Sequence, residues 1–313
     1  MDSEKLKEHF QKNKHSKPII LDGAQGCLLQ EKNPTLFDDD IWMTKINKER
    51  PDEIKRVAME YIDAGAQIIT TNTFRTSPYH LEVFNKKHLS SNYTSDEEVR
   101  NALNPLLELR KEKNIPFYIA GSNAPTEYCY IKKQTLSYEK LKDSHTNHIN
   151  LLQKHGADLI INETLSFANE VEICQKHCFQ NNINNVISLY VVDNGQLNSG
   201  ERAVDVLRKI DEYKPLAISV NCINLQLFKN LIKEGHELIK SLNSGFGYYL
   251  NCGDPKNTET NYLEDNFRPF ITPNDYVEII KEYEYLNPVM VGCCCMSTPE
   301  HIRAISQYYK EKN

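Results

Sequence analysis

Eight short apolar runs, each ending in small or polar residues, are the feature of this 313-residue chain that most constrains its fold. Each run is apolar throughout instead of alternating with polar residues, which is typical of parallel strands buried on both faces. The runs recur roughly thirty to fifty residues apart and occupy residues 17–26, 65–74, 116–125, 156–166, 186–195, 216–224, 245–254 and 288–296.

Segments with helical periodicity separate these runs. The first begins at Pro51 and ends at Gly65, which are typical start and stop residues of a helix. The others cover residues 94–113, 138–156, 166–178, 200–213, 227–242, 273–286 and 299–312. This alternation predicts one α/β domain, a (β/α)8 TIM barrel, over residues 17–313, with a doubly wound open sheet as the alternative. Residues 1–16 are predicted to be an N-terminal polar extension.

Composition excludes several classes of partner. The net charge is −6 and the basic residues are scattered, so we expect no nucleic-acid partner. No signal peptide is visible and no run approaches the roughly 20 apolar residues of a membrane span, so a cytoplasmic location without membrane contact is expected. Nine cysteines in such a chain predict reduced thiols or metal ligands in place of a disulfide framework.

The carboxyl ends of the strands should carry the chemistry of such a barrel. Cys222 ends the sixth run, and three consecutive cysteines, Cys293 to Cys295, end the eighth. Three thiolates with one open position would form a catalytic zinc site. A single cysteine at a strand end is more often a small buried hydrophobe, so the spacing alone leaves zinc binding and packing both open.

The motifs at these strand ends resemble those of the homocysteine S-methyltransferase family, from about residue 20 to 305. The segment "GCCCMSTPEHIRAI" is similar to the family's Gly-Gly-Cys-Cys and Pro-x-His-Ile motifs, and "VNC" to the motif of its third zinc ligand. Weaker matches follow in order: "LDGAQG", "TTNTF", "GSNAP", "NETLSFANEVE" and "NCGD". The resemblance implies zinc bound by Cys222, Cys294 and Cys295; a one-residue shift would make the pair Cys293 and Cys294.

The resemblance also implies an activity, the transfer of a methyl group to the thiolate of L-homocysteine to form methionine. A free thiol is mostly protonated at neutral pH, and binding to zinc deprotonates it, so no catalytic residue beyond the zinc site is needed. The expected donor is a sulfonium, S-methylmethionine or S-adenosylmethionine. Betaine is the alternative, but aromatic faces bind quaternary ammonium best, and Arg75 stands where betaine-using members carry an aromatic residue.

Homocysteine and the methyl donor are the expected partners, and the resemblance implies side chains that bind them. Asp22 and Glu163 would hold the ammonium group of homocysteine, although a turn cap and a surface acid are the ordinary roles of such residues. Asn72 and Thr73 are expected either to line the pocket or to be turn residues with satisfied hydrogen bonds. Asn251 is expected to order the loop after the seventh strand or to approach the donor. The oligomeric state does not follow from the sequence.

Four departures from the family pattern bear on substrate preference: Ala24, Cys27, Asn123 and Ala124. Two other classes of function stay open, a non-catalytic zinc- or thiol-binding member and a redox-sensing barrel. The long polar segment 252–275 is predicted to be either a lid over the site or a surface insertion.

Overall fold

Eight parallel strands form one closed sheet in the computed structural model, which describes residues 3–12, 17–253 and 269–312. The strands are β1 (Ile19–Ile20), β2 (Ile68–Thr70), β3 (Tyr118–Asn123), β4 (Leu159–Leu165), β5 (Asn185–Leu189), β6 (Ala217–Asn221), β7 (Phe246–Leu250) and β8 (Met290–Cys293). β1 pairs with β8, and a parallel bridge between Leu21 and Ile68 joins the β1 segment to β2. The barrel prediction is therefore confirmed and the open sheet is excluded.

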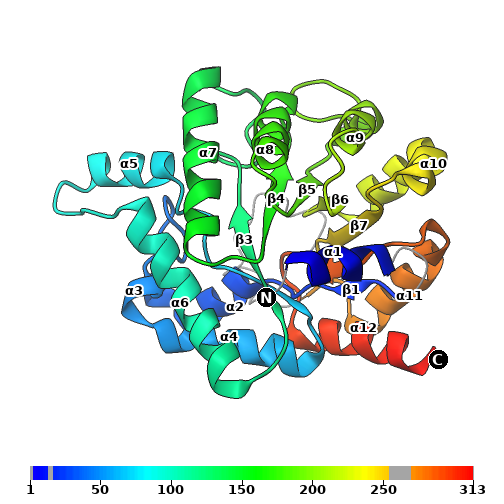
Figure 1. Ribbon diagram of the computed structural model, residues 1–313, viewed down its shortest axis with the longest axis horizontal. Coiled ribbons are helices and arrows are strands. Elements are labelled where there is room, and N and C mark those ends of the chain that lie inside the picture. The colour runs from blue at the N-terminus through cyan, green and yellow to red at the C-terminus, as the bar shows by residue number, and fades with distance from the viewer. Residues whose placement is uncertain (1–2, 13–16, 254–268, 313) are drawn as a thin grey trace.

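Helices surround the strands on the outside (Figure 1). The helices that correspond to the predicted periodic segments are α4 (Pro51–Ala64), α6 (Ser95–Lys113), α7 (Tyr138–Lys154), α8 (Ala168–Gln180), α9 (Ala203–Asp211), α10 (Leu225–Ser241), α11 (Pro273–Tyr283) and α12 (Pro299–Glu311). α4 ends as predicted, with Gly65 in the left-handed conformation at φ 110°. No helix in the described part of the chain is long and apolar enough to cross a membrane.

Shorter elements lie between these units. They are α2 (Gln25–Lys32), α3 (Ile46–Glu49), α5 (Pro78–Lys87) and three 3-10 turns, η2 (Pro34–Leu36), η3 (Asp193–Gly195) and η4 (Glu284–Leu286). α2 follows β1 directly, which brings its first residues to the carboxyl end of the barrel. Residues 254–268, within the predicted lid or insertion, lie outside the described residues.

The hydrophobic core has two layers because successive strand residues point to opposite faces. The larger layer fills the space between strands and helices. The smaller layer lies inside the barrel and is built from the first residues of the strands, including Ile19, Ile68, Tyr118, Leu159 and Met290. The residues nearer the carboxyl ends of the strands therefore form the other, more polar part of the barrel interior.

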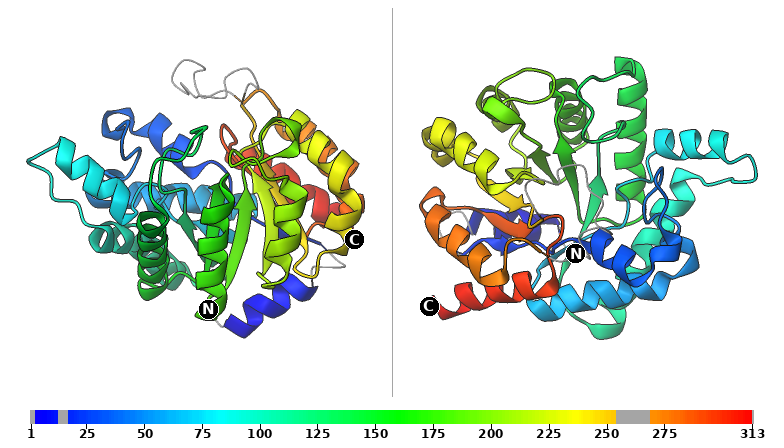
Figure 2. Two further views of the ribbon diagram at one scale, coloured as in Figure 1. Left: turned by 90° about the horizontal axis from the view of Figure 1, so that it is seen from above. Right: turned by 180° about the vertical axis from the view of Figure 1, so that it is seen from behind.

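An N-terminal helix, α1 (Ser3–Lys12), closes the barrel at the end where the strands begin. Leu6 and Phe10 are 1% and 3% exposed and belong to the inner hydrophobic layer. Figure 2 (left) shows this helix in blue beneath the strands. The segment expected to be a polar extension therefore contributes apolar side chains to the barrel interior.

Candidate functional site

A cavity of about 560 Å³ opens at the carboxyl ends of the strands. Its walls come from the segments after β1 and β2, from the loop after β3, from single residues on β4 and β7 and just after β6, and from the three cysteines at the end of β8. Cavities of this size accommodate small-molecule ligands. The barrel thus brings residues from distant parts of the sequence to one rim, as its architecture predicts.

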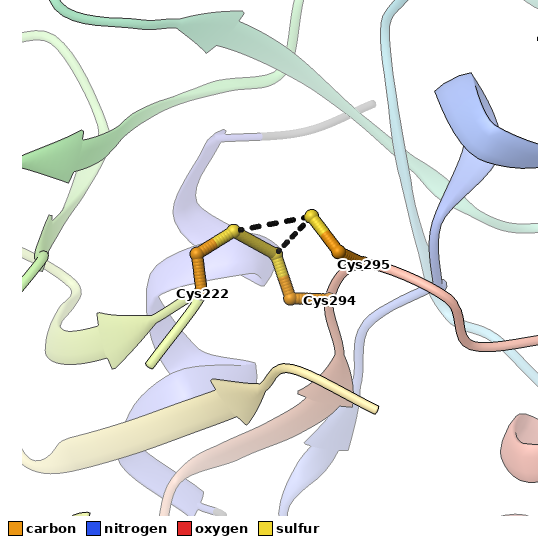
Figure 3. A group of neighbouring side chains, drawn as sticks. All are labelled: Cys222, Cys294 and Cys295. Carbon is orange, nitrogen blue, oxygen red and sulfur yellow. Dashed lines mark hydrogen bonds between the residues drawn. A yellow bond between two sulfur atoms is a disulfide. The ribbon is translucent and has the colours of Figure 1, made fainter. Parts of the chain in front are cut away.

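Three cysteines meet in this cavity (Figure 3). Cys222 follows β6, and Cys294 and Cys295 follow β8. The Sγ atom of Cys295 lies 3.7 Å from that of Cys222 and 3.9 Å from that of Cys294. The three ligand atoms all lie within 4.8 Å of one another. The structure therefore brings together the three residues expected as metal ligands.

The separations suit a tetrahedral thiolate site. Zinc–sulfur bonds of about 2.3 Å place two sulfur ligands about 3.8 Å apart, close to both distances of Cys295. Soft thiolates are also the donor set that zinc prefers. Cys222 and Cys294 are joined by a disulfide here, which differs from the expectation of reduced thiols, so this pair must be reduced before it can bind a metal.

Cys293 also lines the cavity, but its side chain packs on the other side of the strand. Its side chain is 2% exposed and packs in the layer between strands and helices, whereas Cys294 packs against the inner layer. The alternation of side chains along β8 explains this division. The Cys293 thiol lies against Cys252, and burial raises the pKa of Cys252 well above its usual range, with Cys293 adding to the rise. Cys293 is not a member of the group of three sulfur atoms.

Asp22 is a buried carboxyl at the mouth of the barrel, 1% exposed. Its Oδ2 accepts hydrogen bonds from the backbone N–H of Thr70 at 2.8 Å and from Gln25 Nε2. Burial raises the pKa of Asp22 to about 7, although bonds from Gln25 and Thr70 oppose the rise; the charge of Glu163 adds to it. Gln25 Oε1 is a buried acceptor with no partner among the described residues.

Glu163 is another acid of the cavity, which Asp38 and Asp39 also line. It accepts hydrogen bonds from Ser122 Oγ and, at 3.4 Å, from Tyr249 Oη. Burial raises the pKa of Glu163 to about 7, and the bonds from Ser122 and Tyr249 act in the opposite direction. Asp22 and Glu163 therefore hold protons near neutral pH, and a cation bound beside them would favour their negatively charged forms.

The backbone beside Glu163 is held in a local irregularity of β4. The register of β4 on β5 shifts between Asn162 and Leu165, and Thr164 has a φ of 60°. The side chain of Asn221 contacts this bulge at two points: its Oδ1 accepts from Thr164 N and its Nδ2 donates to Thr164 Oγ1, both at 2.9 Å. Bulges beside a site change the direction of a side chain.

The same asparagine precedes the left-handed Cys222, whose φ is 55°. Left-handed backbone at a residue other than glycine is uncommon and persists where neighbouring contacts hold it. Asn221 Oδ1 also accepts from Ser188 Oγ at 2.8 Å, so the amide is fixed from β4 and β5. One buried side chain therefore connects the carboxyl region to the cysteine group.

The remaining expected site residues are held mainly by structural hydrogen bonds. Asn72 lines the cavity, but its amide donates to Met43 O and Asn47 Oδ1. Thr73 is fully buried, and its hydroxyl donates to Ser122 O at 2.7 Å. Asn251 accepts from Gly253 N at 2.8 Å, which orders the start of the loop after β7. Thr73 and Asn251 are not among the described residues that line the cavity.

The four departures from the family pattern have different surroundings. Ala24 and Cys27 line the cavity at the start of α2. Asn123 is fully buried, and its Nδ2 donates a hydrogen bond to Asn162 Oδ1 at 2.8 Å. Ala124 is buried directly after it. Only the first pair can therefore touch a ligand in this cavity directly.

The sequence did not point to several residues of the cavity. Gln25 and Tyr249 contact the two carboxyls, and Trp42, Phe74 and Tyr128 provide aromatic walls. A signal existed for Tyr249, because it lies on β7 in the alternation that places every second residue inside a barrel. The other four lie in loops or at a helix start, where no period assigns a direction.

Comparison with known proteins gives one consistent family. The family model described as homocysteine S-methyltransferase matches residues 19–309. The chain is 25% identical to Homocysteine S-methyltransferase 1 of Arabidopsis thaliana over 94% of each chain. It is also 25% identical to the Bacillus subtilis homocysteine S-methyltransferase YbgG over 93% of this chain and 94% of that one. The metallated homocysteine methyltransferase MmuM of Escherichia coli shares the fold, with a TM-score of 0.73, 21% identity and coverage of 94% and 96%.

The raised pKa of Glu163 predicts a pH-dependent stability. Its folded pKa of about 7 exceeds the ordinary 4.5, so between these values the folded protein binds more protons than the unfolded chain. The free energy of unfolding therefore falls as the pH rises through this range. In Glu163→Gln the free energy of unfolding should fall by about 1–3 kcal/mol less over this pH range than in the wild type. Urea unfolding at about pH 5 and pH 8 would measure it, with exposed Glu212→Gln as the control; equal pH dependence in Glu163→Gln and wild type would contradict the prediction.

Proposed function

Because the chain belongs to the homocysteine S-methyltransferase family, we propose that it moves a methyl group from a sulfonium donor to the sulfur of L-homocysteine. The new S–CH₃ bond forms methionine, and the donor's S–CH₃ bond breaks with its electron pair left on the donor sulfur as a neutral thioether. The observation that carries this proposal is the group of three cysteine sulfurs beside two carboxyls in one cavity. Holding both reactants in such a cavity supplies much of the rate of an in-line displacement.

In the reduced protein, Cys222, Cys294 and Cys295 would hold zinc as three thiolate ligands. Bound zinc would favour the thiolate of homocysteine at neutral pH, the form that attacks a methyl group. The chain's own contribution is to fix the ligands. The backbone of Cys294 donates to Leu250 O at 2.8 Å, and the left-handed Cys222 follows the buried Asn221.

Asp22 and Glu163 would bind the ammonium group of homocysteine. An ammonium brings three N–H donors, and this corner offers two carboxyls and the unpartnered Gln25 Oε1. Binding a cation here would draw the last protons from the two acids, since an adjacent positive charge lowers a carboxyl pKa. Asn72 would form part of this wall of the cavity, and the buried Thr73 would support it. Asn251 would act on the loop after β7.

Arg75 supports a sulfonium donor over betaine. Its guanidinium carbon lies 5.3 Å from the centre of the Phe74 ring and 5.5 Å from that of Tyr128. These aromatic faces already carry a cation, so they are not free to enclose the quaternary ammonium of betaine. An S-methylmethionine-type donor needs less aromatic enclosure because its charged amino-acid end can bind elsewhere.

A redox-responsive thiol barrel is the second candidate, favoured by the Cys222–Cys294 disulfide. In that function the oxidised and reduced forms would be the two working states and no metal would bind. Metal content of the reduced protein separates the candidates, because the methyltransferase requires one zinc per chain.

Loss of one inner cysteine should abolish metal binding, whereas loss of the outward cysteine should not. We expect Cys294→Ala to lose most zinc and at least about 100-fold of the activity, because two thiolates hold zinc far more weakly than three. Cys293→Ala is the matched control and should keep zinc near one per chain. Metal analysis of reduced protein tests this; zinc retained in Cys294→Ala but lost in Cys293→Ala would move the site by one residue.

Glu163→Gln should weaken homocysteine selectively. The neutral amide cannot pair with an ammonium, so the KM for homocysteine should rise roughly 10-fold or more while zinc content is unchanged. Asp193→Asn removes a carboxyl after β5 that does not line the cavity, and its KM should match that of the wild type. An unchanged KM in Glu163→Gln would remove this residue from the binding site.

Donor choice is tested by direct turnover. Reduced, zinc-loaded protein should form methionine from homocysteine with S-methylmethionine or S-adenosylmethionine, at a rate at least about 10-fold above that with betaine. The measurement is methionine released with each donor in parallel at equal concentration. A higher rate with betaine would reverse the donor assignment, and no turnover with any donor in zinc-loaded protein would leave the non-catalytic alternative.

A further inference from the structure

Arg75 is the cation of the cavity: among the described residues that line it, no other carries a permanent positive charge. The remaining charged lining residues are acids, and the walls otherwise consist of thiols, amides, hydroxyls and aromatic rings. A single guanidinium in a cavity of this composition attracts an anionic ligand. Asp38 lines the same cavity, but it pairs with Lys45 at 2.8 Å, and no carboxylate in the described ranges lies within ion-pair distance of Arg75.

The guanidinium is held in place from one side. Arg75 Nη1 lies 2.8 Å from His80 Nε2. Arginine only donates, so this nitrogen accepts, and the imidazole proton is on Nδ1, which lies 2.8 Å from Ser77 Oγ. Burial lowers the pKa of His80 well below its usual range, and Arg75 lowers it further, which keeps the ring neutral. The bond to His80 is the one hydrogen bond of the guanidinium within the described residues, so its other N–H groups are available to a ligand.

The loop that carries Arg75 is also fixed. The Thr76 hydroxyl donates to Thr73 O at 3.1 Å and lies 2.9 Å from His148 Nε2, and Thr76 O accepts from Ser95 Oγ at 2.6 Å. These groups are buried, so the segment between β2 and α5 is anchored to α6 and α7. A preorganised guanidinium loses little entropy when it binds a carboxylate.

Arg75 stacks on Phe74 and Tyr128, and no ion pair joins it to Glu163 in the described ranges. Burial raises the pKa of Cys129 to about 11, and the positive charge of Arg75 opposes that rise. Burial raises the pKa of Glu163 to about 7, but there the opposing groups are Ser122 and Tyr249 and not Arg75. The α-carboxylate of homocysteine is one carbon from the ammonium proposed to bind at Glu163, so the anion at Arg75 comes from the other reactant.

We propose that Arg75 is a specificity-determining residue that receives the carboxylate of the methyl donor, with His80 as its positioning residue. The inference rests on the proposed function and adds a recognition element to it, because both candidate donors, S-methylmethionine and S-adenosylmethionine, carry a carboxylate that Arg75 can receive. Planar guanidinium and carboxylate pair through two parallel hydrogen bonds, which fixes the direction of the donor as well as its affinity. The sulfonium end would then extend from Arg75 toward the three cysteines.

The single tryptophan of the chain allows a binding assay that does not depend on turnover. Trp42 lines the cavity and its ring lies 6.0 Å from that of Phe74, next to Arg75. Titration of Trp42 fluorescence without homocysteine should report binding of two probes. One is S-methylmethionine, and the other is (3-aminopropyl)dimethylsulfonium, which keeps its sulfonium and amine but lacks the carboxylate.

Arg75→Gln should raise the Kd of S-methylmethionine about 10- to 100-fold and change that of the decarboxylated probe less than about twofold. Arg75→Lys should show a smaller loss, because lysine keeps the charge but not the fork. Arg208→Gln, an exposed arginine on α9 bonded to Asp205, is the control and should match the wild type. Homocysteine KM should stay unchanged in all three variants.

Three results would overturn the inference. The first two are an equal Kd of S-methylmethionine in Arg75→Gln and wild type, and equal losses of affinity for both probes. The third is a rise in the KM for homocysteine with no change in the Kd of the donor, because Arg75 would then bind homocysteine and not the donor. Failure of the proposed function looks different, because zinc-loaded wild type would then bind S-methylmethionine through Arg75 and release no methionine.

Discussion

Closure of the parallel sheet is the constraint on which the rest of the molecule depends. β1 pairs with β8, and the bridge from Leu21 to Ile68 joins the ring on its other side. Since every strand runs in the same direction, closure brings the carboxyl end of each strand to one rim. Asp22, Glu163 and Cys222 are far apart in the sequence and share a cavity for this reason alone. Without the ring, Asp22 would keep only its local bond from Gln25, and the three residues would not share a cavity.

Within that rim, fine positioning depends on a few buried polar contacts. Asn221 holds the bulge that carries Glu163 and immediately precedes the left-handed Cys222, so one amide sets the direction of an acid and of a thiol. His80 has a comparable relation to Arg75. In both cases the residue that meets the cavity is directed by a neighbour that does not carry the chemistry. Such a neighbour fixes geometry because a buried polar group must keep its hydrogen bonds.

Sequence reasoning succeeded where a periodic rule applied. Eight continuous apolar runs led to the barrel, and the period of two along β8 explains why Cys294 and Cys293 point to opposite sides. It was less informative where contacts are local and aperiodic. The bond from Gln25 to Asp22 and the stacking of Arg75 on Phe74 depend on loop paths that no period encodes. The disulfide between Cys222 and Cys294 joins residues 72 positions apart, which only the folded barrel brings together.

Helix α1 has a consequence for the order of assembly. It precedes every strand in the chain, yet Leu6 and Phe10 pack on a surface made from the first residues of strands spread over the whole barrel. That surface is complete only after the last strand has joined the first, so α1 can make all of these contacts only in the closed barrel. Non-local pairing of this kind slows folding. Burial of Leu6 and Phe10 therefore depends on the completed ring.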